Sequence, residues 1–158
     1  PNGVGNPGGA ISTIAPSEDQ TTYFANSFQF PAAMRTASSD GLALSFDLST
    51  IHAAADVFFS STFDILVLQT TGLGANNTRL ILGNFFTGPP ADHPSYSHYE
   101  INFTTAQGWE YQEGGGARTP ATQAQIDTVL ANAQSLIIRG EYTDLGGLFV
   151  GEVKMERP

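Results

Sequence analysis

The side chains that could perform acid–base or nucleophilic chemistry are few and scattered. The sequence contains three histidines, His52, His93 and His98, and no cysteine. His93 lies beside Asp92 and two residues before Ser95, which superficially resembles the composition of a Ser-His-Asp triad. A triad is defined by geometry across a fold and not by neighbours in sequence, and a Gly-x-Ser-x-Gly motif is absent. We therefore interpret the histidines as loop or solvated strand residues and assign no catalytic residue.

Metal and phosphate chemistry has equally weak support. Four side chains of metal-binding type occur close together, but their spacing matches no recognised ligand motif. They are Asp92, His93, His98 and Glu100. The glycine-rich stretches fit neither the dinucleotide-binding nor the Walker pattern. We assign no cofactor and no metal-binding residue; a structural calcium ion, bound through carboxylates and carbonyl oxygens, stays open without an assigned site.

Aromatic side chains are the remaining candidates for ligand binding. Trp109 is the only tryptophan, and Tyr111 follows two residues later. Exposed Trp and Tyr rings can stack on sugars or anchor a protein interface. For Trp109, burial in the core is the favoured interpretation, whereas Tyr96 follows Pro94 and Ser95 in a loop-like stretch and is the better candidate for exposure. The candidate ligand-binding residues are therefore Tyr96, Trp109 and Tyr111.

Two triplets match the N-glycosylation pattern, beginning at Asn76 and at Asn102. Asn76 lies in a predicted hairpin turn. Asn102 lies in a predicted strand and points away from Ile101 and Phe103, which would place it in solvent. Both asparagines are candidate glycosylation sites.

The composition is that of a secreted all-β protein. Of the 158 residues, 41% are hydrophobic but only 13% are charged, about half the usual ~25%. The chain is rich in Phe, Tyr and Gly. Its length indicates one domain, which we place at residues 10–158, after a flexible Pro/Gly-rich arm at residues 1–9.

The charge and the apolar runs limit the partners. The net charge is −9, with six Lys and Arg residues in total and no basic cluster. Nucleic acid and anionic membranes are therefore not expected as partners, because their binding requires clustered cations. No apolar run approaches the ~18 residues of a membrane span. Because the chain starts without methionine, we expect a removed signal peptide and an extracellular or cell-surface location.

Strand patterns dominate the chain. The clearest is the alternation of apolar and polar residues at 42–48, which predicts a strand with one buried face. Segments 65–70 and 78–82 are apolar and flank a turn, so they predict a hairpin. Segments 97–103 and 148–155 are further predicted strands. Short strands at this spacing favour an antiparallel sandwich.

The period changes once, near the C-terminus. Ile126, Val129, Leu130 and Ala133 share one face of a helix. The helix has two candidate start signals, Thr119-Pro120 and a capping box from Thr122 to Gln125. From residue 136 the pattern becomes that of a strand, with Leu136 and Ile138 on one face and Arg139 on the other.

These segments together resemble the laminin B domain, also called laminin domain IV. In that family a helix leads through a "vLan…l.IRgeY" segment into the final strand; the corresponding segments here are Val129–Asn132 and Leu136–Tyr142. Leu42–Leu48 is similar to the family's "G.LsFdl" strand, and Trp109 stands at its "gW" position. One departure is the last strand, where the family's "LDNV" is replaced at residues 149–153.

The resemblance implies a jelly-roll fold without catalytic activity, akin to carbohydrate-binding and adhesion modules. We therefore expect an all-β protein, an antiparallel jelly-roll β-sandwich with one short helix at about residues 120–133 before the penultimate strand. The predicted function is that of a non-catalytic extracellular module with an adhesive or structural role, including that of a self-assembling surface or filament subunit. The alternative is a carbohydrate-binding module.

The expected partners follow from the same interpretation. They are protein surfaces or glycans, and a second copy of the chain that joins by strand addition at an open sheet edge.

Overall fold

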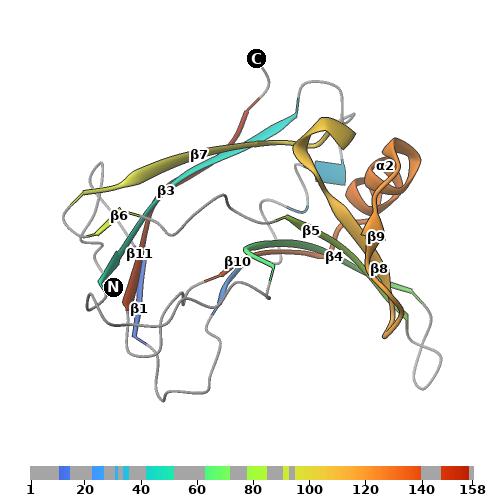
Figure 1. The fold of residues 1–158 in the computed structure, drawn as a ribbon, viewed down its shortest axis with the longest axis horizontal. Helices are drawn as coiled ribbons and strands as arrows, with labels where there is room; N and C mark the ends of the chain where they lie inside the picture. The colour runs from blue at the N-terminus through green and yellow to red at the C-terminus, as the bar shows by residue number, and fades with distance from the viewer. Residues whose placement is uncertain are drawn as a thin grey trace.

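Two mainly antiparallel β-sheets face each other and enclose the hydrophobic core between them (Figure 1). The structure is a computed structural model, and it describes residues 11–14, 23–26, 31, 34–35, 42–51, 63–71, 78–84, 91–92, 95–139 and 147–156. The predicted arm at residues 1–9, the turn at 72–77 and the residues His52, His93 and Asn76 lie outside these ranges.

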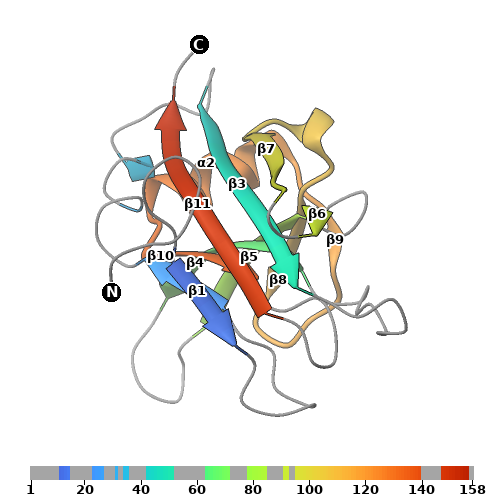
Figure 2. The ribbon, with the colours of Figure 1, turned by 90° about the vertical axis from the view of Figure 1, so that its left-hand side faces the viewer.

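Sheet A is built around its two longest strands, β3 (Ala43–Ile51) and β11 (Gly147–Glu156), which run side by side (Figure 2). Strand β1 (Ile11–Ile14) pairs with the outer side of β11. On the other side of β3 lie β6 (Ala91–Asp92) and β7 (Ser97–Asn102). The short β6 pairing is parallel, and the other pairings of the sheet are antiparallel.

Sheet B contains six strands in the order β2-β10-β4-β5-β8-β9. Their bounds are β2 (Tyr23–Asn26), β4 (Ile65–Thr71), β5 (Thr78–Asn84), β8 (Glu110–Glu113), β9 (Thr119–Pro120) and β10 (Ser135–Arg139). All of these pairings are antiparallel, and β4 with β5 confirms the predicted hairpin.

The core follows from the alternation along the strands. In β3, Leu44, Phe46 and Leu48 are fully buried, whereas the residues between them are half-buried. Strands β4 and β10 of the opposite sheet direct their own alternate residues to the same cluster. Burying each such side chain contributes roughly 1.5–3 kcal/mol, so the buried rows of β3, β4 and β10 hold the two sheets together.

Helix α2 (Gln123–Ala131) closes one end of the molecule (Figure 1). Its N-terminus has the predicted capping box: the Thr122 side chain accepts from the Gln125 N–H, and the Gln125 side chain accepts from the Thr122 N–H. The other predicted start at Thr119-Pro120 is wrong, because those two residues form β9 and pair with β8. The helix is therefore shorter at both ends than the predicted 120–133, and it precedes β10 as expected.

The apolar face of α2 is the one predicted from its period. Ile126, Val129 and Leu130 are buried, and the helix contacts β4 and β5. Met34, whose backbone is helical, is also buried in the core.

Strands β8 and β9 form a hairpin whose turn needs glycine. Gly114 has a φ of 55°, a conformation that side chains with a Cβ rarely adopt. The Gly116 N–H donates to the Glu113 carbonyl at 2.9 Å, and the Gln112 side chain donates to the Gly116 carbonyl at 2.8 Å. These bonds make the run of Gly114, Gly115 and Gly116 a defined turn. The two sheets confirm the predicted all-β class, and the jelly-roll arrangement stays a prediction.

Candidate functional site

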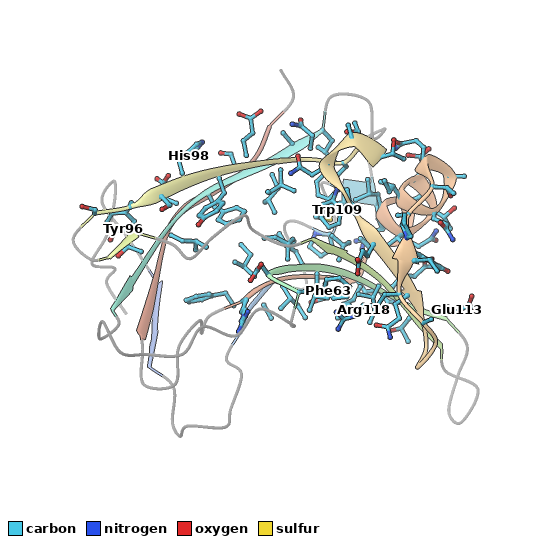
Figure 3. The ribbon with its side chains drawn as sticks, in the orientation of Figure 1. Phe63, Tyr96, His98, Trp109, Glu113 and Arg118 are labelled. Atoms are coloured by element: carbon cyan, nitrogen blue, oxygen red, sulfur yellow. The ribbon has the colours of Figure 1, made fainter. Side chains whose placement is uncertain are left out.

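Strand β7 carries exposed polar side chains to which the sequence assigned no catalytic or metal-binding role. His98 and Glu100 are exposed, and Figure 3 shows His98 on the outer face of sheet A. Glu100 lies two residues further along the strand and therefore on the same face. His98 lies directly opposite Asp47 of β3, and its Nδ1 is 2.7 Å from the Asp47 Oδ1. Because Asp47 is an acceptor, this contact favours the tautomer with the proton on Nδ1 and holds the imidazole ring against the sheet.

One main-chain hydrogen bond beside β7 shows which of its residues direct their N–H and carbonyl groups toward β3. The Phe103 N–H donates to the Leu42 carbonyl at 3.3 Å, which makes these two residues a hydrogen-bonded pair. Such pairs alternate with non-bonded ones in an antiparallel ladder. The main-chain groups of His98, Glu100 and Asn102 therefore point away from β3, toward the open side of β7.

Both main-chain groups of Asn102 are hydrogen-bonded to side chains that follow β7 in the sequence. Its N–H donates to the Gln107 Oε1 at 3.2 Å, and its carbonyl accepts from the Trp109 Nε1 at 2.8 Å. Gln107 belongs to the 3₁₀ helix η2 (Thr105–Gln107), which is the next element after β7. Within the described part of the chain, no such partner meets the outward main-chain groups of His98 or Glu100.

Trp109 is a core residue in this structure. It is 1% exposed, and its ring stacks on that of Phe103 with centroids 5.1 Å apart. A ring in this position has no face to offer to a ligand at the surface. The assignment of Trp109 as a ligand-binding residue therefore has no support here, and the favoured interpretation of burial describes it.

Tyr96 and Tyr111 are both half-buried, and only Tyr111 lies within a strand. Tyr96 precedes β7 at the far end of the molecule from Trp109 (Figure 3). Tyr111 lies in β8, where its ring packs on the core. Burial raises the pKa of the Tyr111 hydroxyl, and the nearby Glu113 charge adds to this rise. The three candidate aromatics therefore do not form one common platform.

A buried ion pair lies at the other side of the core. Arg139 is 1% exposed, and its Nη1 is 3.4 Å from the Asp64 Oδ1. The Arg139 N–H also donates to the Asp64 carbonyl at 2.8 Å. Arg139 was expected on the face of its strand opposite Leu136 and Ile138, and the structure shows it enclosed together with its carboxylate partner.

The charge of Asp64 also affects the pKa of Tyr99 in β7. Burial raises the pKa of its hydroxyl, a side-chain hydrogen bond with Ser97 acts in the opposite direction, and the Asp64 charge adds a further rise. The Tyr99 ring stacks on Phe46 with centroids 5.5 Å apart. Tyr99 therefore faces inward, opposite to His98 and Glu100 on the same strand.

Of the glycosylation candidates, only Asn102 lies in a described range. It is half-buried, and both its main-chain groups are bonded to the following loop, so it is less open than the expected solvent position.

Among the described residues there is no group of three or more His, Asp or Glu side chains arranged to hold a metal ion. No described helix is long and apolar enough to cross a membrane.

The two facing sheets and the core between them define an all-β domain with one α-helix among the described residues. Among solved structures, the L4b domain of human laminin alpha-2 is similar to it, with a TM-score of 0.61 and 16% sequence identity, over 86% of this chain and 70% of that chain. The predicted resemblance is therefore confirmed at the level of the fold. The sequence matches no protein-family model, and a search of curated proteins found no significant match.

Proposed function

We propose that this protein is a non-catalytic extracellular module with an adhesive or structural role, which acts through contacts with other protein surfaces. The observation that carries the proposal is the fold shared with a laminin domain. The exposed polar row of β7 supplies a surface for such contacts. Among the described residues, His98 is the histidine present, and Asp47 holds it on the exposed outer face of sheet A.

Location and role are tested separately. Intact cells of the source organism are treated with an external protease, and the protein is followed by immunoblotting next to a cytosolic control protein. Cleavage of this protein alone is expected. Its protection until the cells are lysed would overturn the extracellular assignment.

The role is tested with beads coated with the purified protein, mixed with the organism's own cells and with uncoated beads. We expect attachment of the coated beads, and we expect it to be competed by the soluble protein. Attachment equal to that of beads coated with an unrelated acidic protein would contradict an adhesive role.

A carbohydrate-binding module is the alternative, and it now depends on Tyr96 and Tyr111. A glycan array probed with the wild-type protein and with Tyr96→Ala and Tyr111→Ala tests it. Binding of a glycan that either substitution abolishes would favour the alternative, and the absence of binding to any glycan would remove it.

A further inference from the structure

Sheet edges differ in how well they are protected against a further strand. Strand β9 is two residues long and contains Pro120, which has no N–H to donate. Strand β6 is equally short, and β1 and β2 have four residues each. Strand β7 has six residues, contains no proline and no lysine, and pairs among the described strands with β3 alone. It is therefore the longest of these outer strands.

The open groups of β7 form a short, symmetric set. His98 and Glu100 each direct one N–H and one carbonyl outward, and Tyr99 lies between them with its own groups turned to β3. If a second β7 approaches antiparallel about a twofold axis at Tyr99, His98 of one copy lies opposite Glu100 of the other. Both residues then form hydrogen-bonded pairs, which makes four main-chain bonds across the edge.

The side chains match in the same arrangement. His98 and Glu100 lie on the same outer face of the strand, so each imidazole meets the carboxylate of the other copy. Asp47 holds the Nδ1 side of His98, and in the imidazolium form, in which both ring nitrogens donate, Nε2 can donate to the Glu100 carboxylate of the other copy. The parallel alternative would place like side chains opposite each other, which is unfavourable for two Glu100 carboxylates.

We propose that β7 pairs with β7 of a second copy of this chain, in antiparallel register centred on Tyr99, so that sheet A continues across a twofold dimer. The proposal rests on the proposed function and specifies the partner surface of that module. Asn102 limits the new ladder, since its main-chain groups are bonded to Gln107 and Trp109. A twofold pairing uses the same edge on both copies and closes, so a filament would require a second edge.

The register is tested by disulfide cross-linking, because the chain has no cysteine of its own. Two single variants are made, His98→Cys and Glu100→Cys, and each is oxidised alone and as an equimolar mixture. Opposite residues of a hydrogen-bonded pair have Cα atoms about 5.5 Å apart, within disulfide range, whereas the same position on both copies is about 7–8 Å apart. We expect the mixture to cross-link and each variant alone to cross-link poorly. Asp127→Cys on α2 is the control for random collision.

The affinity is tested by sedimentation equilibrium at 0.15 M salt, which screens the repulsion between two chains of net charge −9. Glu100→Lys removes the carboxylate opposite His98 and is expected to weaken dimerisation about 2- to 30-fold, whereas His98→Lys places a cation opposite Glu100 and leaves dimerisation equal or tighter. Near-ultraviolet circular dichroism of Trp109 checks that both variants keep the fold.

The outcomes separate the two proposals. A wild-type protein that stays monomeric up to about 1 mM, above the usual range of specific association, would overturn the dimer and leave the module's location and adhesion standing. The edge would then be open to an extended segment of a different protein. Equal cross-linking of the single variants and of the mixture would also overturn the register. A dimer with the expected cross-link in a protein that protease cannot reach on intact cells would keep the dimer and overturn the extracellular function.

Discussion

The indole nitrogen of Trp109 donates a hydrogen bond to the main-chain carbonyl of Asn102, the two atoms lying 2.8 Å apart. The same ring is buried and stacked on Phe103. One side chain therefore both packs in the core and donates a hydrogen bond to the last carbonyl of β7. The end of an edge strand and the packing of the core are therefore coupled through a single residue.

The coupling predicts the effect of two substitutions at this position. Trp109→Phe keeps an aromatic ring but removes the donor, and we expect a loss of about 1–3 kcal/mol in the free energy of unfolding. Trp109→Ala also opens a cavity and should cost about 3–5 kcal/mol. Urea unfolding followed by far-ultraviolet circular dichroism measures both. A Trp109→Phe protein as stable as the wild type would show that the hydrogen bond contributes nothing.

The buried pair of Asp64 and Arg139 predicts non-additive substitutions. Either Asp64→Ala or Arg139→Ala leaves the partner's charge buried without its counterion, and each should cost about 3–5 kcal/mol. The double variant removes both charges, so its loss should be clearly smaller than the sum of the two single losses. Urea unfolding of the four proteins completes the cycle, and strictly additive losses would contradict an interaction between the two side chains.

Gly83 in β5 is predicted to tolerate no side chain. A Cβ added there would overlap the ring of Phe63, which is 3% exposed and is covered by the Arg118 guanidinium at 4.2 Å from its centroid (Figure 3). Gly83→Ala should therefore destabilise the protein by about 1–3 kcal/mol. Gly115→Ala is the matched control, because nothing lies within 4 Å of its added Cβ, and it should change stability by less than about 0.5 kcal/mol. Thermal unfolding compares them, and equal melting temperatures would refute the overlap.

Tyr99 predicts a loss of stability at alkaline pH. Burial raises the pKa of its hydroxyl above 10.0, so the folded state keeps the proton at a pH where the unfolded state releases it. Its contribution is complete below pH 10 and is lost as the pH rises through the higher folded pKa. Tyr99→Phe removes this group, and its stability should decline less steeply than that of the wild type above pH 10. Urea unfolding from pH 8 to 12 tests this; parallel declines would contradict it.

Local patterns determined the secondary structure well where both partners of a contact lie close in sequence. The alternation at 42–48 predicted the buried row of β3. Successive strand side chains point to opposite faces, so covering one face buries every second residue. The reciprocal bonds of Thr122 and Gln125 span three residues, so the capping box identified the true start of α2. The competing start at Thr119-Pro120 failed because pairing with β8, a contact between strands, outweighed a local helix preference.

The site depends on contacts that no local pattern contains. Arg139 and His98 both have the sequence pattern of solvent-facing strand residues. The fold buries Arg139 beside Asp64, 75 positions away, and places His98 on the outer face beside Asp47, 51 positions away. Sequence alone therefore determined the position of the longer strands and of α2, and the buried face of β3. Only the tertiary structure decided which strand lies at an edge and which charges meet, because strand order and register are set by pairing between distant segments.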